Sequence, residues 1–165
     1  MPGRIGLTIA PGKKGAGLEG EWDRDMDEDL ARLREAYGAS MLVSLCEPQE
    51  LAFLRIADLW HRAREVGLQV EAYPFPDGGV PPSRAWLFPL IDALLWAASE
   101  GRTVVIHCRG GLGRSGLVAA CALVARDKPA AEAMAIVRAA RRGAIERDVQ
   151  EEFIRAFEAE WRGAQ

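Results

Sequence analysis

The segment Thr103–Gly116 constrains the fold of this chain more than any other. It begins with a run of β-branched and apolar residues, Thr103–Ile106, which predicts a strand buried on both faces. A tight glycine turn, Gly110–Gly113, follows, and a helical pattern then continues to about Ala125. A buried strand that turns directly into a helix is typical of an α/β protein with a parallel sheet, because helices must cover both faces of that sheet.

The rest of the chain alternates between strand and helix patterns. We expect strands at Arg4–Ile9, Ala39–Cys46, Leu68–Tyr73 and Arg102–Cys108, and helices at Asp25–Tyr37, Leu51–Val66, Ser83–Ser99, Arg114–Ala125, Pro129–Arg141 and Glu146–Trp161. Pro11–Gly20 and Pro74–Pro82 are expected to be loops, and the second has four prolines and two glycines in nine residues. This order predicts a central, mostly parallel sheet flanked by helices.

Length and charge limit the possible functions. A chain of 165 residues predicts a single domain, residues 1–165, with a substantial core. The formal net charge of −3 disfavours a general nucleic-acid or membrane-surface binder. An anionic ligand must therefore be met by a local positive site.

The cysteines indicate a reducing environment. Cys46, Cys108 and Cys121 are odd in number and form no Cys-x-x-Cys pair, which argues against a disulfide framework or a zinc site. No signal peptide or membrane-spanning run is visible, so we expect a cytoplasmic monomer without metal or cofactor. Cys46 and Cys121 lie in apolar runs and are expected in the core.

Cys108 and Arg114 stand at the two ends of the glycine turn. Between them, glycines let the backbone wrap inward so that successive N–H groups point at one spot and bind an anion. Arg114 adds a bidentate guanidinium, and the start of its helix adds partial positive charge. The residues expected to bind phosphate are Arg109, Gly110, Gly111, Leu112, Gly113 and Arg114.

The same environment favours the thiolate of Cys108, which becomes a nucleophile on a bound phosphorus. The leaving oxygen then needs a proton from another segment, and Asp77, in the rigid loop after a strand, is expected to supply it. The Ser115 hydroxyl is expected to hydrogen-bond the Cys108 sulfur, and His107 to orient the loop. The sequence thus predicts phosphate-ester hydrolysis through a phosphocysteine.

The signature His107-Cys108-x5-Arg114-Ser115 resembles that of the protein tyrosine and dual-specificity phosphatases. Together with Pro76–Pro81 it is similar to the kinase-associated phosphatase (cyclin-dependent kinase inhibitor 3) branch, and the similarity runs through nearly the whole chain. The resemblance implies the dual-specificity phosphatase fold and a phosphorylated protein or peptide as substrate. It also implies Cys108 as nucleophile, Arg114 as phosphate binder and Asp77 as general acid.

One position departs from the family pattern. Related enzymes often carry Gln, which helps to place the hydrolytic water, where this chain has Glu146. Gln150 matches a second family Gln and is expected to take over that role.

Other functions remain as alternatives. The same scaffold suits a module that binds phosphorylated ligands without turnover, or a phosphoinositide phosphatase. Gly111-x-Gly113-x-x-Gly116 also matches a dinucleotide-binding fingerprint, but no second strand with an acidic end follows it. A P-loop is excluded because Lys14 stands where Ser or Thr is required.

Several basic residues outside the glycine turn have two interpretations. Lys13 and Lys14 belong to a solvated loop or else line the mouth of the site and attract the substrate, as Arg109 also does. Arg138, Arg141 and Arg142 are expected to be a solvated helix end, and the alternative is a patch that binds the phosphorylated substrate.

Overall fold

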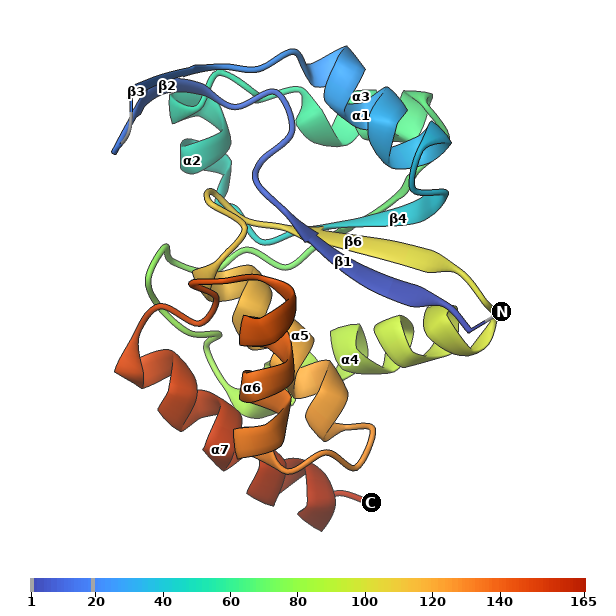
Figure 1. The fold of residues 1–165 in the computed structure, drawn as a ribbon, viewed down its shortest axis with the longest axis vertical. Helices are drawn as coiled ribbons and strands as arrows, with labels where there is room; N and C mark the ends of the chain where they lie inside the picture. The colour runs from blue at the N-terminus through green and yellow to red at the C-terminus, as the bar shows by residue number, and fades with distance from the viewer. Residues whose placement is uncertain (1, 19) are drawn as a thin grey trace.

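A four-stranded parallel sheet separates two layers of helices (Figure 1). The structure is a computed structural model, and it describes residues 2–18 and 20–165. The strands are β1 (Arg4–Thr8), β2 (Lys14–Gly17), β3 (Gly20–Asp23), β4 (Ala39–Ser44), β5 (Gln69–Ala72) and β6 (Thr103–His107). The helices are α1 (Met26–Glu35), α2 (Pro48–Phe53), α3 (Leu59–Glu65), α4 (Arg84–Ser99), α5 (Gly113–Val124), α6 (Ala130–Ala140) and α7 (Asp148–Gly163).

With the order β1-β6-β4-β5 and all strands parallel, the functional loops lie together at the carboxyl end of the sheet. Because β6 is parallel to both neighbours, His107 lies beside Thr8 on one side and Ser44 on the other. The segments that leave β1, β4 and β6 therefore start side by side. Backbone hydrogen bonds continue past the strands, from Leu45 N to His107 O at 3.1 Å and from Ala10 N to Arg109 O at 3.4 Å.

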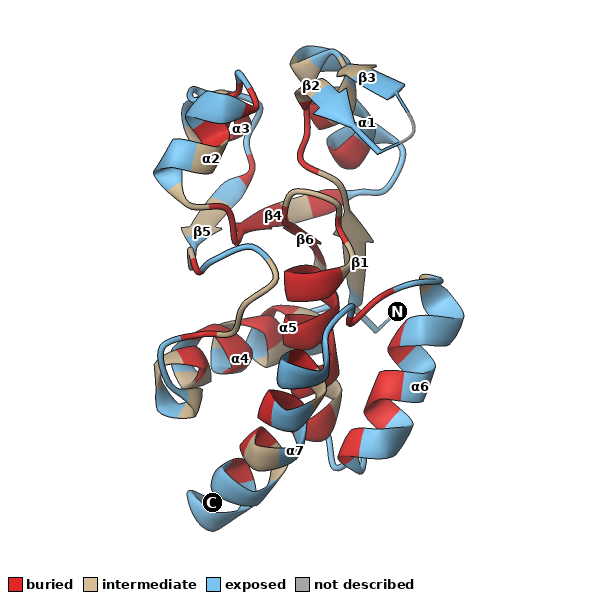
Figure 2. Cartoon of the chain, turned by 90° about the vertical axis from the view of Figure 1, so that its left-hand side faces the viewer, coloured by how far each residue is buried: buried red, intermediate tan, exposed pale blue. Residues whose placement is uncertain are grey.

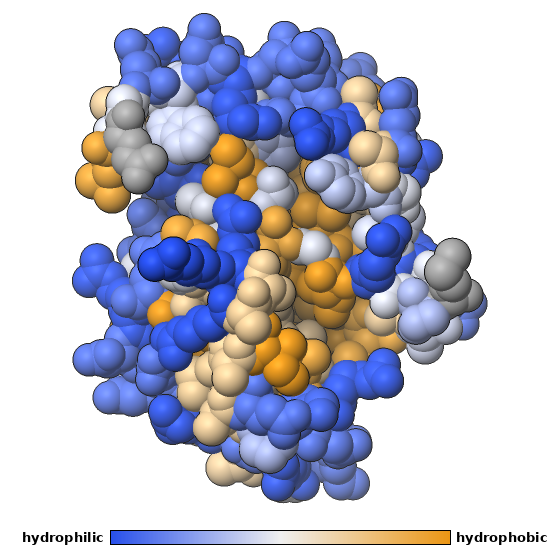
Figure 3. All heavy atoms as spheres, viewed as in Figure 1, coloured by the Kyte–Doolittle hydropathy of each residue, from blue (hydrophilic) through white to orange (hydrophobic). Residues whose placement is uncertain are grey.

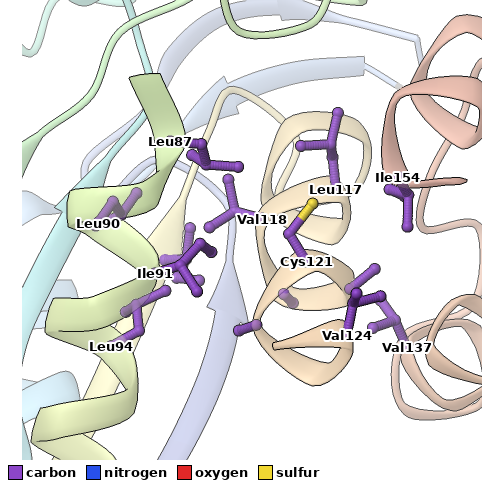
Figure 4. Close-up of a cluster of buried hydrophobic side chains, with 14 of the residues drawn as sticks. Leu87, Leu90, Ile91, Leu94, Leu117, Val118, Cys121, Val124, Val137 and Ile154 are labelled. Atoms are coloured by element: carbon purple, nitrogen blue, oxygen red, sulfur yellow. The ribbon is translucent and has the colours of Figure 1, made fainter. Parts of the chain in front are cut away.

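Helices α4–α7 cover one face of the sheet and α1–α3 cover the other (Figure 1). The larger hydrophobic cluster lies between α4 and α5, where Ile91 and Leu94 pack near Val118 and Cys121 (Figure 4). Helix α5 is buried along almost its whole length, because α4, α6 and α7 all contact it (Figure 2). This enclosure makes α5 a rigid support for the loop at its N-terminus.

The outer edge of β1 is less covered than the rest of the sheet. Apolar side chains gather around it on the face shown in Figure 3, where Ile5, Leu7 and Leu95 line a cavity of about 430 Å³. Among residues 2–18 and 20–165, no helix is both long and apolar enough to cross a bilayer.

The predicted fold class is confirmed, and two local predictions are wrong. The segment predicted as the loop Pro11–Gly20 contains β2, which forms an antiparallel hairpin with β3. The helix predicted at Leu51–Val66 is two helices, because Arg55 adopts a left-handed backbone with φ of 59°. The turn lets the next residue, Ile56, bury its side chain in the same cluster as Leu51.

Candidate active site

The loop between β6 and α5 turns its N–H groups inward. The carbonyls of its residues are all bound on the outside. The Arg109 carbonyl accepts from Ala10 N. The Gly110 and Gly111 carbonyls accept from the Arg141 guanidinium at 3.2 and 2.5 Å. The Leu112 carbonyl accepts from Gly116 N and Ile145 N. In a trans peptide the following N–H points away from the carbonyl. The N–H groups of residues 110–113 therefore face the centre of the loop.

Glycine is required at the tightest point of this loop. Gly111 has φ of 66°, and a Cβ there would lie 2.3 Å from the backbone oxygen of Thr8. The N-cap residue of α5 is Leu112, whose side chain has no acceptor for the N–H groups of the first turn. The loop and the start of α5 together present free donors to an anion.

Arg114 is buried under this loop and held by several acceptors. Its two terminal nitrogens each donate to one oxygen of Glu50 at 2.7 Å. Nη1 also donates to Phe75 O at 2.9 Å and Leu45 O at 3.3 Å, and Nη2 donates to Asp77 Oδ1 at 3.1 Å. Arg114 Nε is buried without a hydrogen-bond partner among the described residues. A buried guanidinium N–H without an acceptor is a suitable donor to an oxyanion.

Glu50 was not predicted from the sequence. Its carboxylate stabilises the positively charged form of Arg114. Burial lowers the pKa of Arg114, but the hydrogen bond and charge of Glu50 outweigh burial and raise it above the ordinary value. Burial raises the pKa of Glu50, and the hydrogen bonds from Arg114 and from the Glu47 backbone hold it below the ordinary value. Both groups therefore stay ionised. The one available signal was position, since Glu50 begins a helix just after β4, the neighbour of β6.

Asp77 reaches the loop from between β5 and α4. Its side chain is 56% exposed, while that of Arg114 is fully buried. The Asp77 loop is attached to the segment after β4 by Phe75 N donating to Leu45 O, and Gly79 N donating to Pro76 O closes it into a turn around Asp77. The structure thus places the predicted general acid against the predicted phosphate-binding arginine.

Cys108 lies at the base of the loop and is buried between His107 and the start of α5. His107 is fully buried with Nδ1 3.2 Å from Cys108 O, and burial, together with the Arg114 charge, lowers its pKa to about 4. His107 is therefore neutral at physiological pH, as a residue that orients the loop should be. The Ser115 hydroxyl is buried without a partner among the described residues, so its predicted hydrogen bond to the Cys108 sulfur is not formed here.

Comparison with known proteins supports the family assignment. The family model for cyclin-dependent kinase inhibitor 3 matches residues 4–136. The chain belongs to this family. The predicted resemblance to the kinase-associated phosphatase branch of the dual-specificity phosphatases is confirmed.

Individual relatives agree with that assignment. The chain is 32% identical to cyclin-dependent kinase inhibitor 3 of Rattus norvegicus, over 73% of this chain and 54% of the relative. It is 33% identical to protein tyrosine phosphatase type IVA 3 of Homo sapiens, over 72% and 62%. A crystal structure of kinase-associated phosphatase with its catalytic-site cysteine changed to serine superposes with a TM-score of 0.85, at 27% identity, covering 96% of this chain and 87% of that one. The chain spans about half the length of the cyclin-dependent kinase inhibitor 3 relatives that it matches.

The two candidates for placing the hydrolytic water, Gln150 and Glu146, differ in burial. Gln150 is fully buried, and its amide oxygen accepts from Glu146 N and Arg147 N at 3.1 and 3.3 Å. Its amide nitrogen donates to Gly79 O at 3.1 Å, so Gln150 ties the start of α7 to the Asp77 loop. Its amide oxygen and one of its two amide N–H groups are therefore engaged, and the second N–H has no partner among the described residues. Glu146 is exposed and lines a cavity of about 540 Å³ at the loop.

Two of the three arginines expected at a solvated helix end, Arg138 and Arg141, donate hydrogen bonds to backbone carbonyls. Arg141 holds the carbonyls of the loop, and Arg138 donates to Ala144 O and Ile145 O and pairs with Glu151 at 2.6 Å. That prediction was wrong for Arg141, whose guanidinium folds back onto the loop, whereas Arg138 and Arg142 are exposed as expected.

Proposed function

We propose that this chain is a phosphomonoester hydrolase of the protein tyrosine and dual-specificity type that acts on phosphorylated proteins or peptides. The observation that carries the proposal is the set of inward donors beside Cys108. The N–H groups of residues 110–113 and the unpartnered Nε of buried Arg114 converge on one anion position. A family in which relatives are named as protein tyrosine phosphatases supports it.

In the first step, the substrate phosphate binds to the loop N–H groups and to Arg114. It takes the Nη2 donor that Asp77 occupies in the free protein, while Glu50 still holds the other side of the guanidinium. The Cys108 thiolate attacks phosphorus, the sulfur–phosphorus bond forms, and the bond to the leaving oxygen breaks. Asp77, released from Arg114, takes up a proton from solvent and gives it to that oxygen. The loop donors stabilise the charge on the equatorial oxygens.

In the second step, water attacks the phosphocysteine. Asp77, now a carboxylate, takes the proton of the water, the sulfur–phosphorus bond breaks, and inorganic phosphate leaves with Cys108 restored as thiolate. We place Glu146 beside this water, because it is exposed and lines the cavity with Asp77, whereas Gln150 is fully buried. The Ser115 hydroxyl donates a hydrogen bond to the departing sulfur.

The test is hydrolysis of p-nitrophenyl phosphate by the wild type and by Cys108→Ser. The wild type should release p-nitrophenol, and the variant should show no turnover but still bind inorganic phosphate, because the loop donors are unchanged. Substantial turnover by Cys108→Ser would remove the phosphocysteine mechanism. A wild type that binds phosphopeptides without releasing phosphate would instead support the binding-module alternative.

A further inference from the structure

Two cations, Lys13 and Arg109, line the 540 Å³ cavity above the loop donors. Lys13 follows β1 and Arg109 follows β6, so the parallel pairing of these strands brings both residues to the carboxyl end of the sheet. Each cation lies over an aromatic ring. Lys13 Nζ is 4.6 Å from the centroid of Trp22, and the Arg109 guanidinium carbon is 5.3 Å from that of Phe53. Cation–π contact holds both side chains in place and leaves their charge uncompensated.

Neither cation has an acidic partner among residues 2–18 and 20–165. Within the described part of the chain, Lys13 and Arg109 form no ion pair and donate no side-chain hydrogen bond. Lys13 is only 7% exposed, and burial and the nearby Arg109 charge lower its pKa. Two like charges held together in a partly buried cavity oppose each other, and an anion between them relieves the repulsion.

The next residue shows that pairing was available in this region. Lys14 Nζ is 2.9 Å from Asp23 Oδ1 and donates to Arg24 O at 2.8 Å. The acidic side chains of the cavity, Asp77 and Glu146, do not serve Lys13 in this way, and Asp77 is bonded to Arg114. Lys13 thus differs from Lys14 in having no ion-pair partner among the described residues.

The walls of the cavity indicate what brings the anion. The scissile phosphate already has the loop donors and Arg114, so Lys13 and Arg109 are in excess of its needs. Another part of the lining is apolar and comes from the β2–β3 hairpin, where Ala16, Leu18 and Trp22 line the cavity and Leu18 is fully exposed. An apolar wall suits the side chains of a peptide better than the hydroxyls of a sugar headgroup.

We infer that Lys13 and Arg109 form a second anion-binding subsite that selects phosphopeptides carrying another anionic group next to the scissile phosphate. The inference rests on the proposed function and names the substrate class of the same site. The second anion is the carboxylate of a flanking acidic residue or a second phosphate. Adjacent residues of an extended peptide are about 3.3–3.6 Å apart along the chain, so a flanking group stays within the cavity.

The experiment compares phosphotyrosine peptides that differ only in their flanking residues, with Asp, Asn or phosphoserine beside the phosphotyrosine. We expect the wild type to prefer the Asp and phosphoserine peptides to the Asn peptide by about tenfold in kcat/KM, the effect of about 1.4 kcal/mol. Lys13→Met, which keeps an unbranched apolar side chain against Trp22, should reduce the preference to about twofold or less. Lys14→Met is the matched control and should keep it, because Lys14 is paired outside the cavity.

The readout is a ratio between peptides for one variant, so a change in the folded fraction cancels. An unchanged ratio in Lys13→Met, or no preference in the wild type, overturns the subsite. A preference that depends on Lys13 for the phosphoserine peptide alone assigns the second anion as phosphate, and one for the Asp peptide as well assigns it as any flanking anion. A preference that depends on Lys13 for a soluble inositol bisphosphate, and for none of the peptides, overturns the peptide assignment.

Binding separates this inference from the proposed function. Affinities for the Asp and Asn peptides are measured in Cys108→Ser with and without Lys13→Met, where no turnover is needed. If p-nitrophenyl phosphate is not hydrolysed by the wild type but the affinity ratio depends on Lys13, the proposed function fails and the subsite stands. If p-nitrophenyl phosphate is hydrolysed and the affinity ratio is one in both backgrounds, only the subsite fails.

Discussion

Replacing Glu50 with glutamine is predicted to reduce both stability and activity, because Glu50 is the carboxylate that holds Arg114. Its two oxygens accept from two guanidinium nitrogens at 2.7 Å, with Arg114 fully buried and Glu50 only 14% exposed. Glutamine keeps one acceptor and turns an NH2 group toward the other N–H, so a charge-assisted bond and the buried counter-charge are lost.

The size of the effect follows from this geometry. A hydrogen bond to a charged group contributes about 1.5–3 kcal/mol, and removing one partner of a buried pair costs about 3–5 kcal/mol. The Leu45 and Phe75 carbonyls and Asp77 still bind Arg114 in the variant. We therefore expect Glu50→Gln to lose about 2–4 kcal/mol of unfolding free energy. For a chain of this length the melting temperature should fall by about 5–15 °C.

Urea and thermal unfolding measure the stability, and p-nitrophenyl phosphate hydrolysis measures the activity. A displaced phosphate-binding group should lower kcat/KM by about 100-fold. Glu132→Gln is the control, because its ion pair with Lys128 is about half exposed and its loss should cost less than about 1 kcal/mol. Stability within about 1 kcal/mol of the wild type, or activity within about threefold, refutes the assigned role of Glu50.

Three further predictions follow from the site. Asp77→Asn should slow hydrolysis of phenyl phosphate by about 100-fold or more and of p-nitrophenyl phosphate far less, because only the poorer leaving group needs the proton; equal losses for both esters contradict the general acid. The His107 pKa of about 4 is lower than in the unfolded chain, so its contribution to stability is complete above about pH 6.5 and declines toward pH 4. Urea titrations should show about 2 kcal/mol lost between pH 7.5 and 5, a loss that disappears in His107→Asn and persists in the exposed-residue control His61→Asn. Gly111→Ala should cost at least about 2 kcal/mol and most activity, because its φ is positive and its Cβ would meet a β1 backbone oxygen; Gly110→Ala, where a Cβ meets nothing within 4 Å, should leave the unfolding free energy nearly unchanged.

The sheet was predictable because its central strands are buried on both faces. Such strands appear in the sequence as short apolar runs, as at Thr103–Ile106, and the helices between them keep their own period. The hairpin Lys14–Asp23 was missed because its strands pair only with each other and show no apolar alternation. The break at Arg55 was missed because apolar residues continue on both sides of it and a left-handed arginine leaves no local mark in the sequence.

The site was predictable where a residue follows a strand directly. Cys108 and Asp77 were found in this way, and the structure brings Asp77 to Arg114. Glu50 and Arg141 were missed because their partners lie 64 and 30 residues away, and only the folded chain brings them together. For Lys13 the sequence left two interpretations open, and its burial in the cavity wall excludes the solvated one.

The two walls of the cavity differ in how freely they can evolve. The catalytic loop is enclosed by the β1 backbone, Arg141 and α5, so most changes there disturb the fold as well as the chemistry. The described residues of the β2–β3 hairpin belong to neither hydrophobic cluster, and the hairpin projects from the body of the protein (Figure 1). Selection can therefore alter the lining that Ala16, Leu18 and Trp22 provide, and change which ligands the cavity accepts, at little cost to the thermodynamic stability on which the catalytic loop depends.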